Sequence, residues 1–100
     1  MQTVLLKLVT IIAETVLAEQ LADELKCLGA KGFTATEARG EGSRHLRAGD
    51  IPGHNVKIET IVSQAVASSI LEHVAQKYFS HYAVIAYVTD VSVVRGEKYV

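Results

Sequence analysis

Apolar residues recur along the chain in two alternating patterns, one typical of strands and one typical of helices. Residues 4–13 form a run rich in leucine and β-branched residues, which predicts a strand. A spacing of three and four residues then predicts an amphipathic helix, whose apolar stripe comprises Leu17, Leu21, Leu25 and Leu28. We expect Thr15 to cap the start of this helix and Gly29 to end it in a left-handed conformation.

The second half of the chain repeats this succession. Residues 33–39 predict a more polar strand, and residues 56–62 predict a third strand. Ser63 is placed to cap a second helix, whose apolar stripe comprises Ala67, Ile70, Leu71, Val74 and Tyr78. Residues 82–88 predict the last strand, and its apolar run continues as far as Val94.

The order strand, helix, strand, strand, helix, strand is that of the ferredoxin-like βαββαβ fold, which belongs to the α+β class. Right-handed crossovers place both helices on one face of a four-stranded antiparallel sheet. A chain of 100 residues with 49% hydrophobic and 21% charged residues fits a single packed domain over 1–100. The net charge of -1 excludes a global electrostatic attraction to nucleic acid or to an anionic membrane.

The first predicted strand is apolar on both of its faces. Leu6 and Leu8 share one face, whereas Leu5, Val9 and Ile11 share the other. A sheet that meets helices on one side and water on the other alternates apolar and polar residues instead. We therefore expect an oligomer whose sheets pack face to face, and a monomer with an exposed apolar face is the alternative.

The remaining sequence shows no sign of an enzyme, a disulfide or a membrane span. Because Cys27 is the only cysteine, an internal disulfide is excluded, and we expect a reduced, cytoplasmic setting. The apolar N-terminus lacks the features of a signal peptide, and no run reaches the ~18–20 apolar residues of a membrane span. No nucleophile, base and orienting residue form a recognisable catalytic set. Metal-ligand spacing is also absent among the histidines, which are His45, His54, His73 and His81.

Residues 40–55 differ from the rest of the chain, and we expect them to form a long, mobile, basic loop. Glycines such as Gly40 and Gly42 allow close approach of the backbone to an anion. Arg44 and Arg47 can present forked donors to phosphate oxygens. The segment lacks the Gly-Lys-Ser/Thr ending of a P-loop. A solvated surface loop is the alternative reading.

Several segments together resemble the PII signalling superfamily. They are residues 29–34, the Gly-Glu-Gly-Ser-Arg-His-Leu-Arg run at 40–47, residues 77–79 and residues 82–83. Within that superfamily they look like the PII-like proteins of inorganic-carbon metabolism, which include regulators of a bicarbonate transporter (SbtB) and carboxysome-associated relatives. The resemblance implies a homotrimer with an adenine nucleotide, whether AMP, ADP, ATP or cyclic AMP, at each subunit seam. It also implies that the loop at 40–55 is the T-loop, which controls a partner in bicarbonate uptake or fixation.

The same resemblance assigns roles to individual positions. Backbone groups lining the nucleotide would come from Gly40, Glu41, Gly42 and Ser43. Arg44 and Arg47 would meet the phosphate, and Phe33 and Thr34 would approach from the neighbouring subunit. Contacts to the base or ribose would come from Ile61, Tyr82, Ala83 and Val84. Bicarbonate is a further candidate ligand near the base of the loop, and no metal or other cofactor is expected.

The chain also departs from standard PII proteins. Residues 78–83 contain no glycine where those proteins carry a second phosphate loop, and Arg44 stands where they carry a magnesium-binding glutamine. A guanidinium repels a metal ion and attracts phosphate, so a mode with Mg-ATP and 2-oxoglutarate is not expected.

Other classes of protein share the order of elements. A structural trimer of the cation-tolerance type has this fold without a nucleotide, and a small α+β-barrel enzyme would need an inward-pointing catalytic group. Acylphosphatase would need a phosphate loop with an arginine directly after the first strand, where this chain has Ala13, Glu14 and Thr15. Stabilisation by adenine nucleotides would separate the regulator from all of these.

Overall fold

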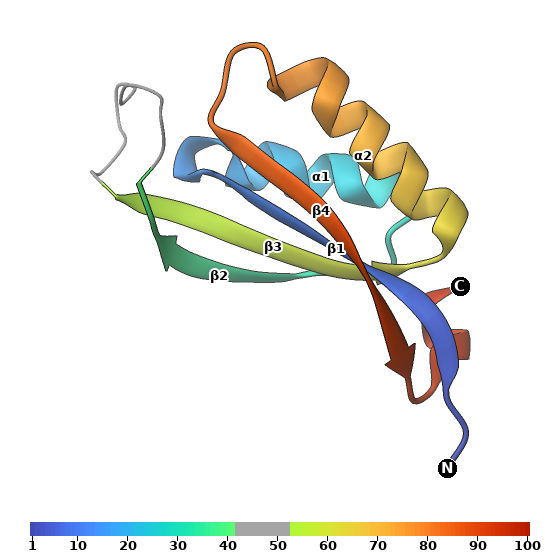
Figure 1. Cartoon of the computed structure of the whole chain (residues 1–100). Coiled ribbons are helices and arrows are strands. Elements are labelled where there is room, and N and C mark those ends of the chain that lie inside the picture. The colour runs from blue at the N-terminus through green and yellow to red at the C-terminus, as the bar shows by residue number, and fades with distance from the viewer. Residues whose placement is uncertain (42–52) are drawn as a thin grey trace.

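The computed structural model describes residues 1–41 and 53–100. Its strands are β1 (Val4–Glu14), β2 (Thr34–Arg39), β3 (His54–Val62) and β4 (Val84–Val93). Its helices are α1 (Ala18–Cys27) and α2 (Gln64–Tyr78), with short 3-10 helices η1 (Thr15–Leu17) and η2 (Gly96–Tyr99). The strands form one sheet in the order β2-β3-β1-β4, and all neighbouring pairs are antiparallel. Both helices cover the same face (Figure 1), which confirms the predicted ferredoxin-like fold.

The start of α1 differs from the prediction. A 3-10 turn over Thr15–Leu17 precedes the helix, so Thr15 is not its N-cap. The Thr15 hydroxyl lies 3.4 Å from the carbonyl oxygen of His54, to which it donates, and it thereby ties the turn to the start of β3. At the other end of α1, Gly29 adopts a φ of 115°, as expected for a residue that ends a helix.

The second helix follows the prediction closely. The Ser63 side chain accepts a hydrogen bond from the N–H of Val66 at 3.3 Å, which satisfies one of the unpaired donors at the helix start. The side chains that α2 buries are Ala67, Ile70, Val74 and Tyr78. The predicted stripe is therefore the face that meets the sheet.

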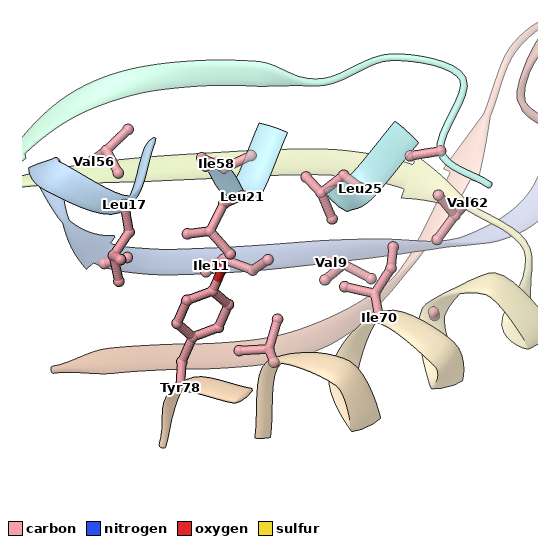
Figure 2. Packing of buried hydrophobic residues seen from close by; sticks show 14 residues of the cluster. Val9, Ile11, Leu17, Leu21, Leu25, Val56, Ile58, Val62, Ile70 and Tyr78 are labelled. Carbon is pink, nitrogen blue, oxygen red and sulfur yellow. The ribbon is translucent and has the colours of Figure 1, made fainter. Parts of the chain in front are cut away.

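The core lies between the helices and one face of the sheet (Figure 2). Val9 and Ile11 of β1 are completely buried there, between Leu21 of α1 and Ile70 of α2. Tyr78 is also buried, and its ring extends from α2 toward the sheet. Burial of such side chains is worth roughly 1.5–3 kcal/mol each, so this layer supplies most of the stability of the domain.

In the described part of the chain, no helix covers the opposite face of the sheet, and this face is partly apolar. On this face Ile85 pairs with Ile12, and Tyr87 pairs with Thr10. Ile85 and Tyr87 are 58% and 44% exposed in the single chain. The sequence prediction of a second apolar face is thus confirmed at β1 and β4, whereas the β3 part of this face also carries Lys57 and Glu59.

The segment expected as a loop is shorter at its C-terminal side than predicted. β3 begins at His54 rather than after residue 55, because His54 and Asn55 pair with Arg39 and Ala38 of β2. Residues 42–52 lie outside the described part of the chain. Within the described part, no helix has the length and apolar character needed to cross a bilayer.

Candidate functional site

The predicted binding residues fall at two ends of the sheet. At one end β2 stops at Arg39, β3 starts at His54, β1 stops at Glu14 and β4 starts at Val84. We call this the loop end. At the other end lie the start of β2, the end of β3 and η2, together with both termini of the chain (Figure 1). We call this the terminal end.

On the β2–β3 side of the loop end, a backbone hydrogen bond joins the residue after β2 to the residue before β3. The N–H of Gly40 donates to the carbonyl oxygen of Gly53 at 2.9 Å, one step beyond the last pair of the ladder. Gly53 has a φ of 76°, a conformation that side chains disfavour. Gly40 and Glu41 are both exposed beside this closure. They therefore stand at the base of the connection, as the sequence predicted.

The β4 side of the loop end is organised around a buried carboxylate. Oε2 of Glu14 accepts a hydrogen bond from the N–H of Ala83 at 2.7 Å. The N–H of Tyr82 donates to the carbonyl oxygen of Tyr78 at 2.9 Å, and the rings of Tyr78 and Tyr82 meet edge to face at 5.7 Å. Tyr82, Ala83 and Val84 are thereby held at the entry to β4, each of them partly exposed.

A cavity of about 480 Å³ lies at the terminal end. It is lined by residues from the turn before β2 and its first residue, the middle of β1, the end of β3, and η2: Leu8, Lys31, Gly32, Phe33, Thr34, Glu59, Thr60, Ile61, Lys98 and Tyr99. This size falls within the range of small-molecule sites. The cavity contains the predicted residues Phe33, Thr34 and Ile61.

Two contacts shape the wall of this cavity. The hydroxyl of Thr60 donates to the carbonyl oxygen of Gly32 at 2.6 Å, which fixes the turn before β2 against β3. The ammonium of Lys26 lies 5.9 Å from the centre of the Phe33 ring, a cation–π distance. Phe33 is 37% exposed and presents its ring at the surface. The wall thus offers a flat aromatic side chain beside backbone polar groups.

The charges of the cavity favour an anion. Lys31 and Lys98 contribute two positive charges, and Glu59 contributes one negative charge. Neither lysine was identified from the sequence, nor was Tyr99. Lys31 could have been identified from the sequence, because it directly precedes the Gly32–Thr34 segment that contains predicted site residues. Lys98 and Tyr99 enter the site only because η2 folds back onto β1, and no local pattern predicts that contact.

One chain does not bring all the predicted residues together. Thr34 and Arg39 stand at opposite ends of β2, five residues apart, which is about 17 Å of strand. Gly40 and Val84 leave opposite edges of the four-stranded sheet, about 14 Å apart at normal strand spacing. The predicted residues Gly42, Ser43, Arg44 and Arg47 lie outside the described residues. Each chain therefore offers two separate parts of the predicted site.

Among the described residues, metal-ligating side chains do not gather at either end. Among residues 1–41 and 53–100, no group of three or more His, Cys, Asp or Glu side chains could hold a metal ion. The cavity lysines also make its charge unsuited to a cation.

Comparison with known proteins agrees with the fold described above. The family model described as nitrogen regulatory protein P-II matches residues 6–98. A crystal structure of a candidate PII-like signaling protein from Thermus thermophilus is 60% identical, with a TM-score of 0.87 and 100% of both chains covered.

Two structures of CPII from Thiomonas intermedia are also similar. The complex with ADP, AMP and acetate is 27% identical, with a TM-score of 0.83, and covers 99% of this chain and 98% of its own. The complex with ADP and bicarbonate is 27% identical, with a TM-score of 0.82, and covers 98% of this chain and 97% of its own. Since the family model spans almost the whole sequence, the resemblance noted from the sequence is confirmed at the level of the family: this chain belongs to the PII family.

Proposed function

We propose that this protein is a PII-like regulator that binds an adenine nucleotide in crevices between the subunits of a homotrimer. The observation that carries the proposal is the division of the predicted site between the two ends of the sheet. For both parts to contact one nucleotide, the loop end of one subunit must lie beside the terminal end of the next subunit. The exposed apolar face of the sheet, with Ile85 and Tyr87, supplies a surface for that association.

In this arrangement, each subunit contributes to two crevices. Phe33, Thr34 and Ile61 approach the ligand from the terminal end of one subunit, together with the cavity lysines. The loop end of the neighbouring subunit supplies the rest, namely Gly40, Glu41, Gly42, Ser43, Arg44, Arg47, Tyr82, Ala83 and Val84. The arginines and lysines bind the phosphate, while the aromatic and apolar groups pack against the base and ribose.

The proposed ligands are AMP, ADP, ATP or cyclic AMP, with bicarbonate as a further ligand near the base of the loop. CPII structures carry ADP with AMP and acetate, or ADP with bicarbonate, which supports this ligand class for a protein of the same family. We assign the protein to the cytoplasm, to a regulatory rather than an enzymatic role, and to the type related to bicarbonate-transporter and carboxysome-associated regulators. Residues 40–55 act as the T-loop, which docks or releases a partner in inorganic-carbon uptake or fixation.

The phosphate contacts make the loop a switch. Ordering a residue costs ~1–2 kcal/mol of backbone entropy, whereas a hydrogen bond to a charged group returns ~1.5–3 kcal/mol. A few contacts from phosphate to Arg44 and Arg47 therefore order part of the loop. The number of phosphates then decides the shape that a partner reads.

Calorimetric titration of the wild type and of the double variant Arg44→Ala/Arg47→Ala tests this proposal. We expect the variant to bind AMP and ADP at least about tenfold more weakly, because two charge-assisted contacts to phosphate are lost. Adenosine serves as the matched control, since it lacks the phosphate and should bind both proteins equally. Equal nucleotide affinity in the two proteins would contradict the phosphate contacts.

A thermal-shift series with adenine nucleotides tests the function itself. Stabilisation of the wild type by AMP, ADP, ATP or cyclic AMP supports the regulator. A wild-type protein that no adenine nucleotide stabilises would instead match a structural trimer of the cation-tolerance type.

A further inference from the structure

The turn between α1 and β2 forms one wall of the cavity at the terminal end, although it is loosely packed. Lys31, Gly32 and Phe33 are exposed and lie outside the helices and strands. A Cβ built on Gly32 would meet no atom of the described residues within 4 Å, apart from its chain neighbours. All three residues line the cavity. Their placement there therefore depends on contacts from neighbouring elements.

The backbone fixes the two ends of this turn. At its start, the N–H of Ala30 donates to the carbonyl oxygen of Leu25 at 3.0 Å, which holds the chain against the end of α1. At its end, Thr34 pairs with Glu59 as the first residue of β2. Residues 31–33 lie between these anchors and belong to neither element. A contact to the middle of the turn therefore has a large effect on how well it is ordered.

Thr60 of β3 supplies such a contact. Its hydroxyl donates to the carbonyl oxygen of Gly32 at 2.6 Å, and the residue as a whole is only 3% exposed. Valine has nearly the same shape, suits the interior of a strand as well, and would bury no polar group there. The hydroxyl is therefore not needed for the packing of β3, and its effect falls on the turn.

The hydrogen bond from Thr60 acts on the cavity through the next residue. The carbonyl of Gly32 and the N–H of Phe33 belong to one planar peptide unit, so fixing the carbonyl also restricts Phe33. The Phe33 ring lines the cavity, and the ammonium of Lys26 lies over it at 5.9 Å from its centre. Together these contacts set the position of an aromatic ring against which a flat base can stack.

We propose that Thr60 is a positioning residue for the nucleoside part of the ligand, because it holds the turn at 31–33 in its binding conformation before the ligand arrives. This inference rests on the proposed nucleotide-binding function. A ligand that meets an ordered wall gives up less conformational freedom on binding than one that must order the wall itself. Since the Thr60 hydroxyl already bonds to Gly32, it acts on the ligand through the turn.

Calorimetric titration of the wild type, Thr60→Val and Thr60→Ser with adenosine and ADP tests the inference. Valine removes the hydroxyl, whereas serine keeps it. We expect Thr60→Val to bind both ligands about fivefold more weakly and Thr60→Ser to stay within about twofold of the wild type.

Val74→Ala is the matched control for lost stability. Val74 is a buried residue of α2 that does not line the cavity, so its truncation destabilises the fold and should leave both affinities unchanged. A wild-type affinity for adenosine in Thr60→Val would overturn the inference. An equal loss of affinity in Thr60→Ser or in Val74→Ala would overturn it as well, because the loss would then not follow the hydroxyl.

NMR order parameters of the backbone N–H groups of residues 31–33 give a test that needs no ligand. In the free proteins, we expect lower order parameters for Thr60→Val than for the wild type and Thr60→Ser. Equal values in Thr60→Val and the wild type would overturn the inference. A wild type that binds neither adenosine nor ADP would instead contradict the proposed function, so the two failures are distinguishable.

Discussion

Gly96 determines whether the C-terminal residues reach the cavity. A Cβ built at this position would lie 2.5 Å from the Cβ of Val4, so only glycine allows η2 to pack this closely against β1. That close packing carries Lys98 and Tyr99 to the cavity wall. Gly96 does not itself line the cavity, yet it positions part of the proposed site.

We expect Gly96→Ala to displace η2 and to weaken adenine-nucleotide binding severalfold, because the positive charge of Lys98 leaves the cavity. Overpacking of this kind also costs about 1–3 kcal/mol of stability, which denaturant unfolding would measure. Calorimetric titration of the variant measures the affinity. The double variant Val4→Gly/Gly96→Ala removes the clashing Cβ and should recover part of that affinity. Unchanged binding in Gly96→Ala would show that η2 is not needed at the site.

At the scale of secondary structure, α1 and α2 are joined by a polar cluster on the outer side of the core. Glu24 of α1 accepts hydrogen bonds from Lys77 and, at 2.6 Å, from the hydroxyl of Tyr78. Nε2 of His73 lies 3.0 Å from the same carboxylate. Burial opposes ionisation of Glu24, but these donors outweigh it and lower its pKa from 4.5. Burial, with Glu24 beside it, raises the pKa of the Tyr78 hydroxyl.

The lowered pKa of Glu24 predicts a loss of stability in acid. As the pH falls below about 4.5, the unfolded state takes up the proton first, so the free energy of unfolding decreases until Glu24 is also protonated in the fold. Above that range the contribution is fully present. Glu24→Gln should therefore lower the free energy of unfolding by about 1–2 kcal/mol at neutral pH and weaken its dependence on acid pH.

Urea unfolding at several pH values measures this effect. Glu72→Gln is the matched control, because Glu72 is an exposed carboxylate on α2 that accepts a hydrogen bond from Gln76 of its own helix. An equal loss in both variants would contradict the role of the helix-bridging cluster.

The sequence predicted the elements better than the contacts between distant segments. The leucine stripe of α1, the Ser63 cap and the positive φ of Gly29 follow from local rules, and the structure confirms them. Thr15 was misassigned because a 3-10 turn intervenes before α1. The cavity residue Lys98 was missed because it reaches the cavity only through the folding of η2 onto β1. Glu14 was noted only as the residue after the first strand, since its bond to Ala83 spans almost seventy positions.

At the scale of the whole molecule, the main unsatisfied feature of a single chain is the apolar face of the sheet that its own helices do not cover. Ile85 is 58% exposed and Tyr87 is 44% exposed on the face opposite the helices. Apolar area removed from water contributes ~25 cal/mol per Å², so contact between such faces from several chains stabilises an assembly. The proposed crevices depend on that assembly.

We expect Ile85→Lys to dissociate the proposed trimer, because a buried ammonium without a partner opposes association. Sedimentation velocity of the variant and the wild type measures the mass in solution. Val16→Lys is the matched control, since Val16 is 57% exposed but lies on η1, away from the open face. A wild type that sediments as a monomer, or an Ile85→Lys variant that keeps the wild-type mass, would contradict the trimer.

The separation of the two ends of the sheet has a genetic consequence. In the proposed ring, a subunit with a defective loop end still contributes an intact terminal end to the crevice that it shares with one neighbour. A subunit with a defective terminal end likewise contributes an intact loop end to the crevice that it shares with the other neighbour. Two alleles that are each inactive alone would therefore complement each other in mixed rings. Conversely, a subunit with defects at both ends would inactivate both crevices that it borders, so an allele encoding it would act dominantly over the normal gene.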